Sequence, residues 1–106
     1  MKIGQEIIEK QDYEIEKMIS KDKIKIKVGD KGFVDSRGRV NYTTGAGRGA
    51  IVNYDLEVKG YDHENIAKMI FNRLNAVYGL ETYLEDEEIE YKEFVEEIED
   101  VLMDIL

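Results

Sequence analysis

The sequence predicts an α+β fold: a three- to four-stranded antiparallel sheet with an N-terminal helix and a C-terminal antiparallel helix pair, in the order α-β-β-β-α-α. Apolar and polar residues alternate over residues 23–28 and 51–59, which indicates two strands. Apolar residues recur with helical spacing over residues 62–78 and 82–105, which indicates the two C-terminal helices. Because the alternating strands have one polar face, we expect an antiparallel sheet with one side in solvent.

The first predicted element is a helix over residues 4–20. Its apolar residues fall near one helical face, at Ile8, Ile15, Met18 and Ile19. The stripe breaks at Gln11-Asp12. The alternative is a shorter helix followed by an extended segment over residues 13–19.

The strand over residues 23–28 is expected to point its isoleucines and valine inward and its three lysines outward. A turn over residues 29–32 follows. Residues 33–34 and 39–43 are then predicted to form a hairpin, closed by a loop in which Gly38 takes the left-handed position. The glycine-rich segment Thr44–Ala50 is predicted to be a mobile hairpin tip. The strand over residues 51–59 that follows it is expected to bury Val52, Tyr54, Leu56 and Val58.

The second helix has clear end signals. Asp62 is a suitable N-cap, Tyr61 and Ile66 suit a hydrophobic staple, and Gly79 suits a left-handed helix end. Its predicted buried stripe is Ile66, Met69, Ile70, Leu74 and Val77.

The third helix is predicted to start at a capping box formed by Thr82 and Glu85, with Asp86 as an alternative cap. The first start would place the acids at residues 85–88 near the first turn, where the helix dipole stabilises negative charge. The predicted inward residues are Tyr91, Phe94, Val95, Ile98, Val101, Leu102 and Ile105.

At 106 residues the chain is the size of one domain, and we expect a single α+β domain over residues 1–106. It contains no cysteine, which excludes disulfides and cysteine-ligated metal sites. Its first residues lack the apolar core of a signal peptide, and no apolar run is long enough to span a bilayer. We therefore expect a cytoplasmic protein, in the host cytoplasm if a phage encodes it, and no membrane contact.

No pattern in the sequence supports catalysis. The glycines at 45, 47 and 49 have the wrong spacing for a dinucleotide fingerprint and precede a strand rather than a helix. His63 is the only histidine, and no nucleophile is predicted to lie beside it. We therefore expect no enzyme activity, no catalytic residue, no metal site and no cofactor.

Charge is distributed unevenly along the chain, whose net charge is −9. Residues 17–48 carry 9 basic and 3 acidic residues, whereas residues 81–106 carry 1 basic and 12 acidic residues. Such a single-sign field attracts oppositely charged partners and also destabilises the structure that carries it. One interpretation is a solvated helix face that keeps the protein soluble. The other is an acidic surface that binds a basic partner.

The acidic surface is the preferred interpretation. A protein that binds DNA through lysines and arginines would find on it a negative counter-surface, with salt-sensitive affinity. We expect a protein partner with a basic groove, bound through Glu85, Asp86, Glu87, Glu88, Glu90, Glu93, Glu97 and Asp100.

A family resemblance is consistent with this interpretation. The segment Tyr83–Glu88 before and into the last helix, with the helix over Glu64–Asn75, resembles small acidic phage anti-CRISPR proteins of the Cas9-inhibiting type. The chain departs from them in its greater length, its glycine loop and its basic middle. The resemblance implies an N-terminal helix, a three-stranded sheet and two C-terminal helices. It also implies a phage or mobile-element inhibitor that mimics DNA and blocks a CRISPR nuclease.

Two alternatives remain open at this point. The basic sheet and hairpin could bind nucleic acid directly, with Tyr42 available for base stacking. The basic residues concerned are Lys23, Lys25, Lys27, Arg37, Arg39 and Arg48. The chain could instead be a homo-oligomeric structural or adaptor protein, in which the acidic helix of one subunit meets the basic sheet of another.

Overall fold

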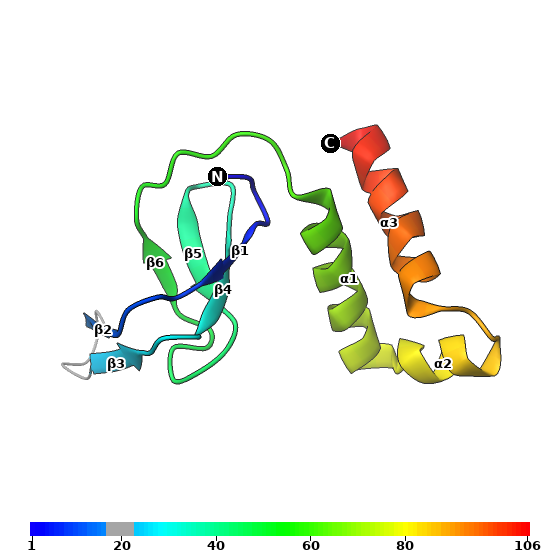
Figure 1. Ribbon diagram of the computed structural model, residues 1–106, viewed down its shortest axis with the longest axis horizontal. Helices are drawn as coiled ribbons and strands as arrows, with labels where there is room; N and C mark the ends of the chain where they lie inside the picture. Colours follow the sequence, from blue (N-terminus) through cyan, green and yellow to red (C-terminus); the bar gives the residue numbers. More distant parts are fainter. Residues whose placement is uncertain (17–22) are drawn as a thin grey trace. The chain divides into compact units, whose positions relative to one another are not determined.

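A computed structural model describes residues 1–16 and 23–106 of the chain. The chain divides into two compact units, here called the β unit (residues 1–60) and the helical unit (residues 61–106) (Figure 1). Each unit contains a hydrophobic core of its own.

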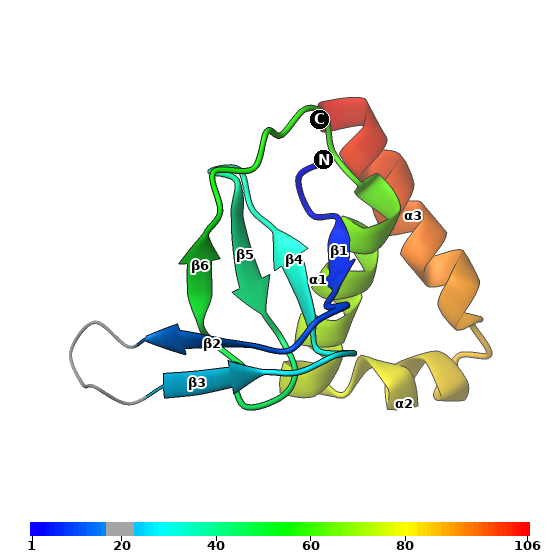
Figure 2. The ribbon, with the colours of Figure 1, turned by 60° about the vertical axis from the view of Figure 1, so that its left-hand side comes forward.

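The β unit contains six strands in two antiparallel sheets. The larger sheet has the order β1-β4-β5-β6, and the smaller is the hairpin of β2 and β3. The hairpin runs across the strands of the larger sheet (Figure 2). The strands are β1 (Glu6–Ile8), β2 (Tyr13–Glu16), β3 (Lys23–Ile26), β4 (Lys31–Val34), β5 (Arg39–Tyr42) and β6 (Ile51–Asn53).

The predicted fold order was wrong, because no N-terminal helix forms over the described residues 4–16. Gly4 has a φ of 84°, outside the helical region, and the next residues form β1. Ile8 of β1 pairs with Lys31 of β4, and Tyr13 of β2 pairs with Ile26 of β3. Long-range pairing therefore overrides the local helical pattern. The rest of the predicted helix, residues 17–20, lies outside the described residues.

The hairpin of β4 and β5 matches the sequence prediction. Val34 pairs with Val40, and Gly38 has a φ of 75° in the connecting turn. The turn is organised by the Asp35 carboxylate, which accepts hydrogen bonds from the N–H groups of Arg37 (2.9 Å) and Arg39 (3.1 Å). It also accepts from the Arg39 guanidinium (2.8 Å) and the Asn41 amide (3.0 Å).

These hydrogen bonds keep Asp35 ionised. Burial raises the pKa of this carboxyl, but the bonds from Asn41, the two backbone N–H groups and the Arg39 side chain outweigh it and lower the pKa to about 2. The contribution of Asp35 to stability is therefore present above the ordinary carboxyl pKa of about 4 and is lost as the pH falls toward 2.

The glycine-rich loop packs on the β unit. A Cβ on Gly47 would come within 2.3 Å of the Ile26 side chain, so the loop lies against the core residue of β3. The N–H of Gly49 donates to the carbonyl oxygen of Tyr42 at 2.9 Å, which ties the loop to β5. The loop is thus a packed connection between β5 and β6.

The predicted strand over residues 51–59 is shorter than expected, because β6 ends at Asn53. Asp55 has a φ of 50°, which extended backbone does not adopt, and its N–H donates to the Asn53 side chain at 2.9 Å. The next residue, Leu56, donates its N–H to the carbonyl oxygen of Gly38 at 3.0 Å. The segment after β6 therefore pairs with the β4–β5 turn instead of continuing the ladder.

The core of the β unit joins its two sheets. Ile26 of β3 is buried with Val40 and Tyr42 of β5. Partly buried residues complete the cluster: Ile7, Tyr13, Ile15, Ile24, Ala50, Val52 and Leu56. Val28, which was predicted to point inward, is 63% exposed because β3 ends two residues earlier.

The helical unit contains α1 (His63–Tyr78), α2 (Leu80–Asp86) and α3 (Tyr91–Ile105). The predicted cap of α1 is confirmed, because the Asp62 carboxylate accepts a hydrogen bond from the N–H of Asn65 at 3.0 Å. Its predicted end is also confirmed, because Gly79 is left-handed (φ 67°) and donates its N–H to the Asn75 carbonyl oxygen.

The start of the last helix was predicted wrongly. Thr82 and Glu85 lie within α2, and α3 begins only after Glu90, which makes no side-chain capping bond. A left-handed turn at Glu88 (φ 55°) ends α2, where the N–H of Ile89 donates to the Leu84 carbonyl oxygen at 2.9 Å. Ile89 also packs on the cluster that contains Leu84, as in a Schellman ending.

We expect Glu88→Gly to stabilise the helical unit by about 0.5–1 kcal/mol, because glycine removes the left-handed strain at a smaller cost in unfolded-chain entropy. Urea unfolding followed by far-UV circular dichroism measures the change. Glu87→Gly is the matched control: it makes the same charge change at a φ of −93° and should destabilise the unit. Equal effects of the two substitutions would contradict the strain at Glu88.

The core of the helical unit uses a face of α1 that the sequence prediction missed. Ala67 and Phe71 of α1 are buried with Leu84 of α2 and Val95 of α3. Within the predicted stripe of α1, Leu74 is 36% and Val77 61% exposed. The predicted inward residues of α3 are correct for Phe94, Val95, Ile98 and Leu102, but Tyr91, Val101 and Ile105 are exposed.

Candidate functional site

The twelve acidic residues over 81–106 lie mainly at the surface of the helical unit. Eleven are exposed and one, Glu99, is partly exposed. Of the predicted partner-binding residues, Glu85 and Asp86 end α2, Glu87 and Glu88 form the turn after it, and Glu90 precedes α3. The remaining ones lie on α3: Glu93, Glu97 and Asp100. The acids at 85–86 therefore lie at a helix C-terminus, where the dipole disfavours them, instead of in the predicted first turn.

Little positive charge balances these carboxylates within the unit. Residues 61–106 contain 3 basic and 14 acidic residues, which gives a net charge of −11. Residues 1–60 contain 12 basic and 10 acidic residues, which gives a net charge of +2. Among the ion pairs of the described helical unit, one involves the twelve acids, Lys92 with Glu96 at 3.9 Å. Lys68 pairs instead with Glu64.

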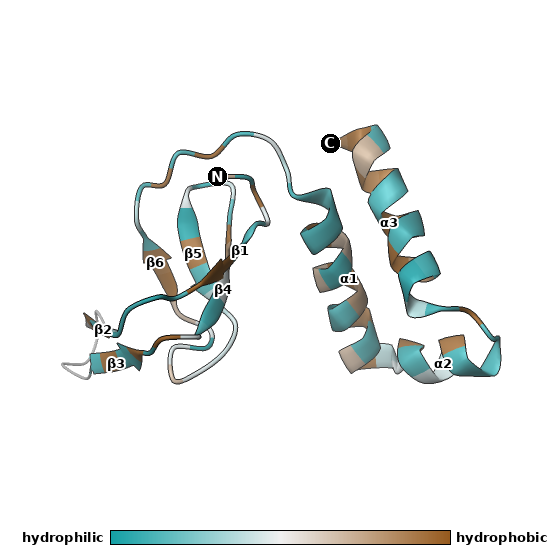
Figure 3. Cartoon of the chain, viewed as in Figure 1, coloured by the Kyte–Doolittle hydropathy of each residue, from teal (hydrophilic) through white to brown (hydrophobic). Residues whose placement is uncertain are grey.

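One set of carboxylates follows a single face of α3. Glu93, Glu97, Asp100 and Asp104 recur every three or four residues, and all four are exposed. Since α3 rises by about 1.5 Å per residue, the row is about 16 Å long. Hydrophilic residues cover most of α2 and α3, with hydrophobic ones returning at intervals (Figure 3). The four residues are here called the α3 acidic row.

The predicted basic residues belong to the β unit. Lys23 and Lys25 are on β3, Lys27 follows it, and Arg37 lies in the β4–β5 turn. Arg39 starts β5, and Arg48 is in the glycine-rich loop.

Acidic residues lie beside several of these basic side chains. Arg39 is bonded to Asp35, and Lys23 lies 3.6 Å from Glu14. Lys25 is directly opposite Glu14 in the β2–β3 ladder, and Lys25 and Lys27 line a groove together with Asp12 and Glu14. Tyr42, which the nucleic-acid alternative needs for stacking, is only 3% exposed. These features reduce the positive and aromatic surface offered to nucleic acid.

The structure also shows where His63 lies, and whether the described residues could hold a metal ion or span a membrane. The Nε2 atom of His63 lies 3.0 Å from the backbone oxygen of Leu106, and so links the start of α1 to the end of α3. Within residues 1–16 and 23–106, no three His, Cys, Asp or Glu side chains are grouped so that they could hold a metal ion. In the same part of the chain, no helix is long and apolar enough to cross a membrane.

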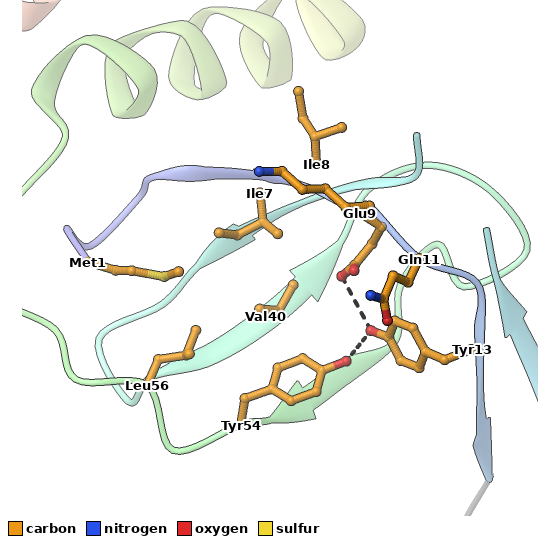
Figure 4. A pocket seen from close by; sticks show the side chains of 10 residues that line it. Met1, Ile7, Ile8, Glu9, Gln11, Tyr13, Val40, Tyr54 and Leu56 are labelled. Atoms are coloured by element: carbon orange, nitrogen blue, oxygen red, sulfur yellow. Dashed lines mark hydrogen bonds between the residues drawn. The ribbon is translucent and has the colours of Figure 1, made fainter. Parts of the chain in front are cut away.

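A polar cluster that the sequence prediction missed lies in the β unit (Figure 4). The Glu9 carboxylate accepts hydrogen bonds from the hydroxyls of Tyr42 (2.7 Å) and Tyr13 (3.3 Å). The Tyr54 hydroxyl is bonded to those of Tyr42 (2.9 Å) and Tyr13. The rings of Tyr13 and Tyr54 meet edge to face, with centroids 6.4 Å apart. Glu9, Tyr13, Tyr42 and Tyr54 are here called the Glu9 cluster.

The phenols of Tyr13 and Tyr54 are held neutral, because the pKa of each is raised above its ordinary value. Burial raises the pKa of Tyr13, and the hydrogen bond and the charge interactions with Tyr54 and Glu9 raise it further. Burial also raises the pKa of Tyr54, against the lowering effect of its hydrogen bond to Tyr13. The alternation in Tyr13-Glu14-Ile15-Glu16 is the sequence signal for β2. The preferred helix over residues 4–20 misses it, whereas the alternative of an extended segment over residues 13–19 is correct for its described part, residues 13–16.

No protein-family model, curated protein or solved structure matches this chain. The candidate sites of this chain are therefore the two described above, the acidic surface of the helical unit and the Glu9 cluster.

Proposed function

We propose that this chain is a non-enzymatic interaction protein of a phage or mobile element, which inhibits a nucleic-acid-binding protein by offering it an acidic, nucleic-acid-like surface. The supporting observation is the exposed and largely unpaired state of the carboxylates at residues 81–106. Because few of these carboxylates form ion pairs within the described part of the chain, few internal contacts would have to break when they bind a basic groove that normally binds phosphates. The setting is the cytoplasm of the host cell.

The cost of this arrangement favours a binding role over simple solvation. Like charges at i and i+4 destabilise a helix by about 0.2–0.5 kcal/mol per pair, and the row contains two such pairs, Glu93 with Glu97 and Asp100 with Asp104. The last turn of α3 contains no basic residue that would balance the helix dipole. A surface of interspersed acidic and basic residues would keep the protein equally soluble without this cost in helix stability.

The target proposed from the family resemblance is a CRISPR nuclease. The test is a competition experiment, in which the full chain displaces labelled duplex DNA from a guide-loaded nuclease at two ionic strengths. We expect displacement that weakens as salt rises, because surface charges are screened over about 10 Å at moderate salt. The triple variant Glu93→Gln/Glu97→Gln/Asp100→Asn should displace DNA about tenfold less well, a loss of about 1.4 kcal/mol.

The matched control is Glu6→Gln/Asp55→Asn/Glu57→Gln. It removes the same three negative charges from exposed positions of the β unit, which changes the net charge from −9 to −6 in both variants. Displacement by this control should equal that of the unmodified chain. Equal losses in the two variants would mean that only overall charge matters, which contradicts the proposal.

Two further measurements separate the alternatives. Tight binding of the chain to free DNA in a gel shift would favour the nucleic-acid-binding alternative. A particle mass that is a multiple of the chain mass at low salt, and falls as salt rises, would favour the homo-oligomer.

A further inference from the structure

The β unit contains a cavity of 520 Å³, within the range of small-molecule binding sites. Its wall is largely apolar and is formed by the side chains of Met1, Ile7, Val40 and Leu56 among others. At one side of it the Tyr13 hydroxyl points toward the Glu9 carboxylate, and the Tyr54 hydroxyl points toward that of Tyr13 (Figure 4). The cavity therefore combines an apolar body with one polar end.

Within the described part of the chain, the carboxylate at that polar end is not paired with a cation. Among residues 1–16 and 23–106, no basic side chain forms an ion pair with Glu9. Lys10 also lines the cavity but is exposed, and the N-terminal amine donates to the Glu57 carbonyl oxygen. Both phenol bonds end on Oε1 of Glu9, and Oε2 has no hydrogen-bond partner in the described part of the chain.

The hydroxyls of the three tyrosines have no proton left to donate in a hydrogen bond to a ligand. Each hydroxyl has one proton, and a carboxylate only accepts, so Tyr42 donates to Glu9. The protons of Tyr13 and Tyr54 are directed at oxygen atoms of Glu9 or of a neighbouring phenol. The cluster therefore offers acceptor oxygens and one negative charge. A matching ligand must donate hydrogen bonds and carry positive charge.

We propose that this cavity binds an alkylammonium group, with the nitrogen at Oε2 of Glu9 and the alkyl chain along the wall of Ile7, Val40 and Leu56. The rings of Tyr13 and Tyr54 add attraction, because a cation within about 6 Å of an aromatic ring is stabilised by its electrons. The ligand is either a free amine or the side chain of a lysine on another protein. This inference is independent of the acidic surface, because it concerns the β unit alone.

The test is an NMR titration of the full chain with hexylammonium, which follows the methyl signals of Met1, Val40 and Leu56. We expect saturable shifts at these methyls. Hexyl alcohol, which has the same chain without the charge, and hexanoate, which has the opposite charge, should bind about tenfold more weakly or not at all. Nα-acetyl-lysine methylamide distinguishes the two sources: tighter binding than hexylammonium indicates a protein side chain, and weaker binding indicates a free amine.

Two variants connect binding to the cluster. Glu9→Gln keeps the size of the side chain, removes the charge and should weaken hexylammonium binding about tenfold. Glu6→Gln is the control, because it makes the same change at an exposed residue of the same segment and should leave binding unchanged. If Glu9→Gln fails to fold, Tyr54→Phe, which removes one acceptor and keeps the ring, should weaken binding severalfold.

Three results would overturn the proposal. The first is the absence of saturable shifts at the cavity methyls. The second is equal affinity for hexyl alcohol or hexanoate, which would show that the charge of Glu9 is not recognised. The third is an equal loss of affinity in Glu9→Gln and Glu6→Gln, which would show a general charge effect.

Discussion

Replacement of Gly38 by alanine should destabilise the β unit by about 3 kcal/mol or more, through left-handed strain and a backbone clash together. Gly38 has a φ of 75°, and a Cβ there would lie 2.3 Å from the carbonyl oxygen and 2.9 Å from the nitrogen of Leu56. Both atoms belong to backbone that is bonded to this turn, since the Leu56 N–H donates to the Gly38 carbonyl oxygen. The turn and the segment after β6 must therefore separate to accept a methyl group.

Gly49→Ala separates the two causes. Gly49 is also left-handed, with a φ of 88°, but a Cβ there would meet nothing within 4 Å. Its replacement should cost about 1–2 kcal/mol from strain alone. Urea titrations followed by the amide NMR signals of β5 and β6 measure both variants. If Gly38→Ala costs no more than Gly49→Ala, the predicted clash with Leu56 is wrong.

The same contact explains why the sequence predicted the β4–β5 hairpin but not the length of β6. The Asp35–Gly38 turn is a local signal, in which the glycine provides the left-handed position and the aspartate binds nearby N–H groups. The end of β6 depends on a bond between Leu56 and Gly38, which lie far apart in the sequence. Alternation over 51–59 correctly places Val52 and Leu56 against the core, but Tyr54, which it also predicts to be buried, is 41% exposed. The alternation also does not indicate where the ladder stops.

The helix prediction for the N-terminal segment was wrong for a related reason. Residues 4–16 contain isoleucines at spacings that suit a helix, together with helix-favouring glutamates and one lysine. Their strand conformation comes from pairing with β4 and β3, which begin many residues later in the chain. The ends of α1 were predictable because Asp62 and Gly79 act on their own neighbours. A single sequence thus predicts structures that depend on neighbouring residues, such as helix ends. It does not predict strand pairs between distant residues that override a local helical pattern.

This difference also decides which candidate site the sequence could suggest. The acidic surface is contiguous in the chain, so its composition alone identifies it. The Glu9 cluster joins Glu9 and Tyr13 of one segment to Tyr42 and Tyr54 of another. The helix prediction for residues 4–20 concealed it, because the cluster depends on the pairing of β1 with β4 and of β2 with β3, which a helix would not form.

The helical unit should be most sensitive to the loss of Phe71. This side chain is 3% exposed and meets Tyr91 and Phe94 edge to face, with ring centroids 4.8 Å and 5.8 Å away. Phe71→Ala removes both aromatic contacts and leaves a cavity between α1 and α3, so we expect a loss of about 3–5 kcal/mol. Urea unfolding followed by far-UV circular dichroism measures this loss.

The proposed function makes the same substitution informative, because α3 presents its acidic row only while Phe94 and Val95 on its other side stay packed on α1. Phe71→Ala should therefore weaken DNA displacement although it removes no charge. Phe71→Leu is the matched control: it keeps most of the buried volume and should cost only about 1–2 kcal/mol, with displacement retained. Full displacement by a Phe71→Ala chain whose helices have unfolded would mean that a disordered acidic segment suffices. The ordered row on α3 would then not be the recognition element.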